Sequence, residues 1–328
     1  MHDLSLLRLV VDGIPPWRDS NLLIKDLEVD EVPLRIYQPK WPPAGKRRGI
    51  LYFHGGAGTF GSISKKPAGF IFKVKSKSLP LSHVSASHLF FLMTTDFVNP
   101  YHVDPALIIL GGDSCGANFA TVICQILVNK RNLPKVRAQI LLYPGLQGLD
   151  FQLPSYQQNA SVPILSRKLV IYFCFRYLNR KPSYFEDIIQ NCHVPESMKR
   201  KYKKWISADN IPDEFKIRGY KSQKYTSYKP EVHEAIKEVL AMTFSPLLAE
   251  DAIICQLPES YIVTCEFDVL RDDGLLYKKR LEDNGIQVTW YHSKSGFHGI
   301  LAFFGYGIFS FLSGEKIMDN TVNYINSL

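Results

Sequence analysis

The strongest constraint on the fold is a short turn between two regular segments. The apolar run ALIIL at 106–110 leads into GDSCG at 112–116, and a helical pattern follows directly. A G-x-S-x-G turn between a buried strand and a helix strains the serine backbone and leaves its hydroxyl exposed at the sheet edge. Gly112 and Gly116 are needed because side chains there would collide with neighbouring elements. The pattern predicts that Ser114 is a nucleophile.

The alternative for this turn is a glycine-rich loop that holds a phosphate. Neither G-x-x-x-x-G-K-[ST] nor G-x-G-x-x-G fits these residues. We therefore retain the nucleophile interpretation, with Asp113 as a supporting residue of the turn.

A second glycine-rich segment follows an earlier apolar run. GILYF at 49–53 ends in His54-Gly55-Gly56, at the edge of the sheet where ligands bind in such folds. Acyl transfer places negative charge on the former carbonyl oxygen, and backbone amides stabilise it where glycine leaves the approach open. We expect the amides of Gly55, Gly56 and Cys115 to form an oxyanion hole. His54 is expected to orient this loop rather than to act as the base.

A serine nucleophile needs a histidine base, which comes late in the chain when the nucleophile sits on such a turn. Three histidines qualify: His233 lies in a helical pattern, His292 ends a strand-like run, and His298 stands between glycines. A glycine-flanked loop is the more suitable place for a mobile base. We predict His298 as the base and keep His292 as the alternative.

The base in turn needs a carboxylate to orient it. Asp268 lies just beyond the strand-like run SYIVTC at 260–265, in a loop that faces the same edge. Glu266 is a weaker candidate, and Asp272 and Asp273 are typical of the start of the next helix. The alternative role for Asp268 is that of a helix N-cap.

Buried strands and helices alternate along most of the chain. Continuous apolar runs suit strands buried on both faces, and their alternation with helices predicts an open α/β sheet. The predicted strands are 33–39, 49–53, 106–110, 138–144, 260–265 and 287–292, and the predicted helices are 115–130, 275–284 and 315–327. Residues 151–244 interrupt this rhythm as inserted helices and loops, so the predicted core comprises 1–150 and 245–328. The uncharged stretch 295–314 is predicted to be a buried C-terminal helix rather than a membrane span.

Charge and cysteine content argue against several other classes of protein. The net charge is +8, and residues 196–229 hold ten Lys or Arg against four Asp or Glu. No nucleic-acid recognition motif accompanies this charge, so binding to nucleic acid is not expected. The cluster Lys199–Trp205 is typical of a solvated helix face; the alternative is contact with an anionic membrane surface, with Trp205 at the interface.

The six cysteines form no C-x-x-C pair, so no metal site is expected. Asn159-Ala-Ser is a glycosylation sequon.

The motifs also carry a resemblance to known proteins. H-G-G, G-D-S-x-G, FDVLRDDG and GFHG, in this order, resemble the hormone-sensitive lipase family of α/β hydrolases. LPSYQQNASVPILSRK and NIPDEFKIRGY resemble more narrowly the arylacetamide deacetylase-like proteins of types 3 and 4, and the resemblance covers nearly the whole chain. It implies an α/β-hydrolase fold with a Ser114–Asp268–His298 triad, an oxyanion hole at His54–Gly56, and a lid over an apolar pocket to which 151–244 contributes.

The resemblance further implies hydrolysis of small apolar carboxylic esters or acetamides through an acyl-enzyme on Ser114, with no cofactor and no obligate protein partner. It implies a location in the endoplasmic reticulum, in the membrane or the lumen; we expect no anchor or signal in this chain, and the cytoplasm is the alternative. Ala57 stands where many members have a third glycine. The segment 57–105 is short for such a core, so one strand or helix within 60–81 is predicted to be missing. This shortening supports an alternative function, that of a catalytically impaired relative.

Overall fold

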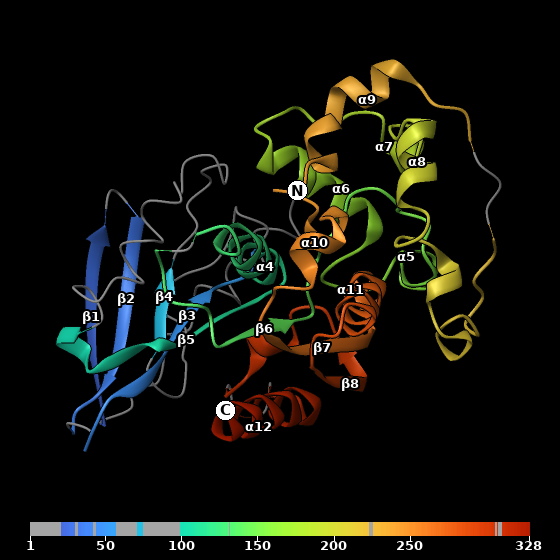
Figure 1. Ribbon diagram of the computed structural model, residues 1–328. Coiled ribbons are helices and arrows are strands. Elements are labelled where there is room, and N and C mark those ends of the chain that lie inside the picture. The colour runs from blue at the N-terminus through green and yellow to red at the C-terminus, as the bar shows by residue number, and fades with distance from the viewer. Residues whose placement is uncertain are drawn as a thin grey trace.

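One sheet forms the centre of the protein. The computed structural model describes residues 21–29, 32–41, 44–56, 71–74, 99–130, 132–222, 226–305, 307 and 310–328. Within these ranges the strands lie in the order β1-β2-β4-β3-β5-β6-β7-β8 (Figure 1). Their bounds are β1 (Leu22–Val29), β2 (Val32–Pro39), β3 (Arg47–Phe53), β4 (Ile71–Val74), β5 (Val103–Asp113), β6 (Ala138–Leu142), β7 (Glu259–Phe267) and β8 (Val288–Phe297). From β4 to β8 the neighbours in this order pair in parallel, whereas β1 and β2 pair antiparallel.

Two groups of helices accompany the sheet. The helices α4 (Cys115–Leu127), α11 (Arg271–Asp283) and α12 (Leu312–Ser327) pack directly on the strands. Further helices are α5 (Pro154–Gln158), α6 (Arg167–Tyr177), α7 (Phe185–Ile189), α8 (Glu196–Tyr202), α9 (Pro230–Ile236) and α10 (Asp251–Ile254). The 3₁₀ helices are η1 (Asn99–Tyr101), η2 (Ala208–Asn210), η3 (Asp213–Phe215), η4 (Lys237–Leu240), η5 (Pro246–Leu248) and η6 (Ile300–Phe303).

Successive residues of the central strands face opposite sides of the sheet, and both sides are covered. Leu110 and Leu141 join the apolar cluster that includes residues of α4 and α11, whereas Ile109 and Ile140 join the cluster that includes residues of α12. Figure 1 shows α4 and α11 on one side of the sheet and α12 on the other. Full burial of each such side chain stabilises the fold by about 1.5–3 kcal/mol. The predicted doubly covered α/β sheet is thereby confirmed.

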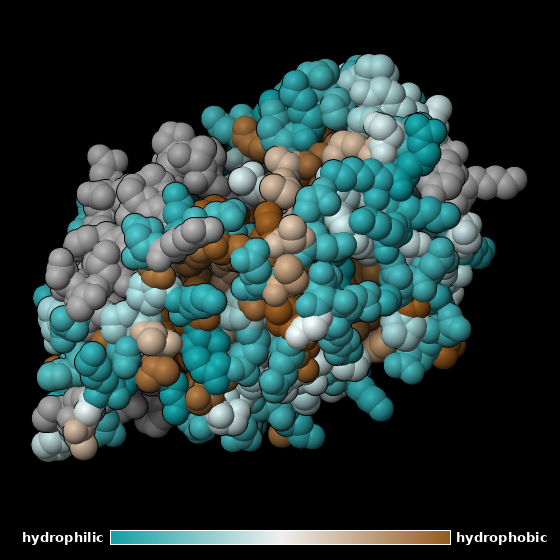
Figure 2. Space-filling model, in the orientation of Figure 1, coloured by the Kyte–Doolittle hydropathy of each residue, from teal (hydrophilic) through white to brown (hydrophobic). Residues whose placement is uncertain are grey.

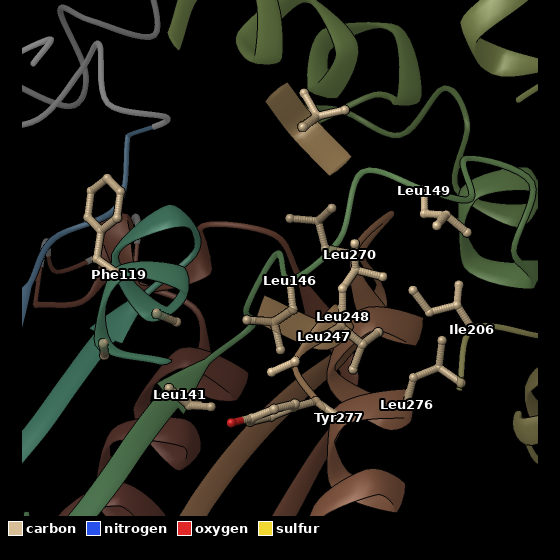
Figure 3. Close-up of a cluster of buried hydrophobic side chains, with 14 of the residues drawn as sticks. Phe119, Leu141, Leu146, Leu149, Ile206, Leu247, Leu248, Leu270, Leu276 and Tyr277 are labelled. Carbon is tan, nitrogen blue, oxygen red and sulfur yellow. The ribbon is translucent and has the colours of Figure 1, made fainter. Parts of the chain in front are cut away.

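Residues 151–244 form α5 to α9 and three of the 3₁₀ helices, with no strand among those that the structure describes. Figure 3 shows where this segment meets the core: Ile206 lies beside Leu276 of α11, and both belong to the same buried apolar cluster. In Figure 2 apolar side chains gather around α4, whereas the outer surface of the inserted helices is mainly hydrophilic. The insertion therefore shares one apolar core with the sheet.

The prediction of a missing strand within 60–81 is wrong. β4 occupies four residues of this segment and pairs with β2 on one side and β3 on the other, so the sheet is continuous there. Each of the four residues of β4 has a register partner in both neighbouring strands. The other part of the prediction, a missing helix, falls on residues outside the described ranges.

The predicted buried helix at 295–314 is also wrong. β8 continues to Phe297, η6 follows, and α12 begins only at Leu312. Gly299, Gly305 and Gly307 have φ between 58° and 77°, a left-handed conformation that interrupts a helix. In the portion of the chain that the structure covers, no helix combines the length and apolar character needed to cross a bilayer.

The sheet order determines where a ligand site forms. The chain leaves β3 for β4 on one side and returns to β5 on the other, so the order of the strands reverses between β3 and β5. Ligands bind at such a switch point, beyond the carboxyl ends of the strands. His54 follows β3 and Ser114 follows β5, which places both predicted motifs at this point.

Candidate active site

The turn between β5 and α4 holds Ser114 in a strained conformation. Its φ of 56° and ψ of −124° are rare for a residue with a side chain. A Cβ atom on Gly116 would lie 2.0 Å from the carbonyl oxygen of Phe53, and one on Gly112 would lie 2.3 Å from the carbonyl carbon of Gly116. The two glycines therefore allow β3, the turn and the start of α4 to pack against one another. The predicted collision of side chains at these positions is confirmed.

Ser114, His298 and Asp268 form a chain of hydrogen bonds. The Ser114 Oγ lies 2.8 Å from His298 Nε2, and His298 Nδ1 lies 2.9 Å from Asp268 Oδ2. Because Nδ1–H donates to the carboxylate, Nε2 keeps its lone pair for the serine hydroxyl. Asp268 is fully buried and His298 is 6% exposed, so little water competes for these bonds. The structure thus brings the three residues together as predicted from the sequence.

The two oxygens of Asp268 have different partners. Oδ1 accepts a hydrogen bond of 2.8 Å from the amide of Leu270, one residue before α11 begins, while Oδ2 accepts from His298. The alternative of a helix N-cap therefore accounts for one oxygen, and the histidine accounts for the other.

Tyr143 is a neighbour of His298 that sequence reasoning missed. It follows β6 with a φ of 38°, and its ring meets the imidazole edge to face at 5.2 Å between centroids. Burial raises the pKa of Tyr143 well above its ordinary value, so the phenol stays neutral. The neutral, buried ring keeps the imidazole in place. The only sequence signal was an aromatic residue at the end of an apolar strand.

The prediction for the oxyanion hole needs one correction. The amide of Gly55 donates to Asp113 Oδ1 at 2.9 Å, and Tyr52 donates its hydroxyl to the same oxygen at 2.9 Å. A Cβ on Gly55 would lie 2.5 Å from Asp113 Oδ2, so glycine serves a close approach to this carboxylate. Gly55 is therefore wrongly predicted as an oxyanion donor, because its N–H group is already bound to Asp113.

Gly56 and Cys115, the other two predicted donors, stay predictions. Gly56 has a φ of 121°, which favours glycine, and Cys115 opens α4 directly after the nucleophile turn. His54 is 6% exposed, and its Nδ1 donates to the carbonyl of Gly55 at 2.6 Å. This bond suits the predicted role of His54 in orienting the loop.

The alternative base and acid pair with each other and not with Ser114. His292 Nε2 lies 3.2 Å from Glu266 Oε2, and His292 Nδ1 lies 3.0 Å from the hydroxyl oxygen of Thr264. His233 donates from Nδ1 to the carbonyl of His193 at 2.8 Å. None of these groups is bound to the nucleophile turn by the hydrogen bonds described.

The start of α11 is a buried polar network that the sequence analysis missed. Arg271 is 1% exposed; its guanidinium binds Asp272 at 2.9 Å and the carbonyl of Phe215 at 2.8 Å. Asp273 accepts from the amide of Leu146 at 2.8 Å, and burial raises the pKa of Asp273 to about 7. The expectation that Asp272 and Asp273 open a helix is confirmed, but their burial depends on residues far away in the chain.

The sequon asparagine is inaccessible in the folded protein. Asn159 has no exposed surface, and its Nδ2 donates to the backbone carbonyls of Glu266 and Asp268. A glycan on this nitrogen is incompatible with these contacts.

The basic cluster Lys199–Trp205 is partly buried. Lys199 is 8% exposed and pairs with Glu196 at 2.8 Å. Trp205 is 7% exposed and packs 3.7 Å from the guanidinium of Arg280. The alternative interpretation places Trp205 at a membrane interface, whereas in this structure the ring is packed inside the protein. Contact of the remaining cations with an anionic surface stays a prediction.

No metal-binding group is evident in the ranges that the structure covers, where no three His, Cys, Asp or Glu side chains cluster suitably. All six cysteines are free thiols.

Comparison with known proteins agrees with this architecture. A family model described as the α/β hydrolase fold matches residues 82–206 and 217–302. Arylacetamide deacetylase-like 3 of Mus musculus is 40% identical over 344 residues, covering 99% of this chain and 81% of the relative. Arylacetamide deacetylase-like 4 of Homo sapiens is 38% identical over 341 residues, covering 99% of this chain and 83% of the relative.

A solved structure from a study of two fungal esterases of Rhizomucor miehei superposes with a TM-score of 0.66 at 20% identity, covering 97% of this chain and 84% of that chain. At this identity the likeness concerns the fold. The sheet order and the family model define an α/β hydrolase. Within that class, the chain belongs to the arylacetamide deacetylase-like family, as its motifs predicted.

Proposed function

We propose that this protein hydrolyses small, apolar carboxylic esters or acetamides through an acyl-enzyme on Ser114. The observation that carries the proposal is the continuous hydrogen-bond chain from Ser114 through His298 to the buried Asp268. The relatives are named as deacetylase-like proteins, which supports an acetyl group as the acyl part.

The geometry supports a two-step reaction. Ser114 Oγ attacks the carbonyl carbon while its proton passes to His298 Nε2, and the carbonyl oxygen takes up the negative charge. The tetrahedral intermediate then expels the alcohol or amine, which takes the proton from His298. Water attacks the acyl-serine in the same way, with His298 again accepting and returning a proton. Asp268 holds the imidazole in the required tautomer and stabilises its positive form.

The developing oxyanion is assigned to the amides of Gly56 and Cys115. Cys115 directly follows the nucleophile, the usual position of one such donor on this turn. Removing one donor of this kind typically lowers the rate about 10²–10³-fold. Residues 151–244 are assigned as a lid, since they share a core with α11 and their polar groups bind the loop of Asp268. The location in the endoplasmic reticulum rests on the resemblance alone and stays a prediction.

A fluorophosphonate probe, which labels activated serines, tests the proposal. The wild type is expected to be labelled and to hydrolyse p-nitrophenyl acetate, whereas Ser114→Ala is expected to lose labelling and to lose rate by about 10⁴–10⁶-fold. Ser207→Ala is the matched control, because Ser207 caps η2 in the insertion, where its hydroxyl oxygen accepts from the amide of Asp209. A wild-type protein that unfolds cooperatively but is neither labelled nor active would reject the proposal in favour of the catalytically impaired relative.

A further inference from the structure

The side chain of Asn159 lies against the loop that carries Asp268. It directly follows α5 in the inserted segment and is completely buried. Its Nδ2 donates to the carbonyl oxygen of Asp268 at 2.9 Å and to that of Glu266 at 3.1 Å. Both hydrogens of one amide group are thereby bound to two carbonyls on either side of Phe267.

Arg218, also in the inserted segment, fixes the other end of this amide. Its Nη2 donates to Asn159 Oδ1 at 3.2 Å and to the carbonyl of Glu266 at 2.9 Å, while its Nε binds Glu266 Oε1 at 2.8 Å. Ser155 adds a third contact, donating its hydroxyl to the carbonyl of Val269 at 2.8 Å. Three carbonyls of the loop therefore accept hydrogen bonds from the insertion.

This backbone determines where the carboxylate of Asp268 lies. The Cα position and the direction of the side chain follow from the loop, and Oδ2 must stay within hydrogen-bond distance of His298. A displacement of about 1 Å in such a group lowers rates by up to about 10²-fold. The insertion therefore has a direct physical path to the proposed reaction, although Asn159 itself has no contact with His298 or Ser114 among the bonds described.

We propose that Asn159 is a positioning residue that holds the Asp268 loop in register with His298, so that the inserted segment sets the reactivity of the site. This inference rests on the function proposed above. It assigns to the Asn-Ala-Ser segment a role in catalysis through Asp268, in place of glycosylation.

Substitution by alanine has two expected consequences. Asn159→Ala leaves the carbonyls of Glu266 and Asp268 with one donor fewer in a buried site, so the loop relaxes and kcat falls about 10–10²-fold, with KM within about twofold. The imidazolium formed during the reaction loses stabilisation when the carboxylate moves away. The acid limb of the pH–rate profile is therefore expected to move to lower pH.

The experiment compares kcat, KM and pH–rate profiles for p-nitrophenyl acetate in matched variants. Gln157→Ala is the control: this amide lies in α5, two residues before Asn159, but it binds carbonyls within the insertion, those of Gln152 and Lys221. Asn159→Ser, which keeps one donor, is expected to recover part of kcat. Arg218→Ala, at a more exposed position, is expected to shift kcat and the profile in the same direction by about 3–10-fold.

Three results would overturn the inference. The first is a folded Asn159→Ala variant with the kcat and pH profile of Gln157→Ala. The second is a lower kcat with an unchanged pH profile, since general loosening would produce it. If Asn159→Ala does not fold, an Arg218→Ala variant with the wild-type profile is the third. Failure of the proposed function is distinguishable, because the wild type itself would then be neither labelled nor active.

Discussion

Two histidine–carboxylate pairs lie at the same edge of the sheet and differ in what they can do. Glu266 of β7 meets His292 of β8 at 3.2 Å, and just beyond the ends of these two strands Asp268 meets His298 at 2.9 Å. The second nitrogen of His298 faces the Ser114 hydroxyl, whereas that of His292 faces Thr264. A paired imidazole is therefore not sufficient for an active site, since its remaining nitrogen must also face a nucleophile.

The carboxylates differ as well. Glu266 is shared with Arg218 at 2.8 Å and Arg271 at 3.2 Å, so its charge joins the insertion to α11. Asp268 instead accepts one hydrogen bond from the imidazole of His298 and one from the backbone amide of Leu270. The first pair therefore joins the insertion to α11, whereas the second carries the imidazole that faces Ser114.

The largest expected difference between the two pairs is the loss of kcat when each histidine is replaced by alanine. His298→Ala is expected to lower kcat for p-nitrophenyl acetate by about 10⁴–10⁶-fold, because the serine loses its proton acceptor. His292→Ala is expected to change it by less than about tenfold. Steady-state kinetics on both purified variants measure the difference, and similar losses in the two would show that the pairs are not distinct in function.

The second largest difference is expected between variants of the two carboxylates, Asp268 and Glu266. Asp268→Asn keeps the shape but presents an amide to His298, which favours the wrong tautomer and lowers kcat about 10⁴-fold. Glu266→Gln is expected to lower kcat less than about tenfold and the free energy of unfolding by about 1–3 kcal/mol, since Arg218 and Arg271 lose a charged acceptor. Urea unfolding together with kinetics separates the two effects. A variant at Glu266 as inactive as Asp268→Asn would contradict the assignment.

The smallest expected effect is on the pH dependence of stability. Burial lowers the pKa of His292 below its ordinary value, although Glu266 partly opposes this. The folded state therefore resists protonation, and the corresponding stability is present above about pH 6.5 and lost as the pH falls below it. His292→Gln is expected to lose less unfolding free energy than the wild type between about pH 7 and pH 5. An equal loss in both proteins, measured by urea unfolding, would show that His292 does not contribute.

The main elements of the fold could be predicted because the information is local. Ile108, Ile109 and Leu110 are buried although successive residues face opposite sides of the sheet, and this requirement is visible as an apolar run in the sequence. β4 is harder to predict, since four residues are fixed mainly by the pairing of both neighbours. The helix predicted at 295–314 is absent because three glycines with positive φ interrupt it despite its apolar content.

The active site also contains residues that a local pattern predicts and contacts that it does not. Ser114, His298 and Asp268 were predicted because each follows or precedes a recognisable turn, and chain order limits the choice. The bond from Gly55 to Asp113 spans 58 residues, and that from Asn159 to Asp268 spans 109. No local pattern indicates such contacts, because they exist only after segments far apart in the chain have packed together.

The backbone of Ser114 has a consequence for how this protein would change without selection for activity. Its conformation costs of the order of 1–3 kcal/mol for a residue with a side chain, and glycine would adopt it with less strain. The most stable residue at this position is thus one that has no hydroxyl to attack a carbonyl. Folding and chemistry favour different residues at position 114, so a lineage that no longer needs hydrolysis is expected to drift toward glycine there.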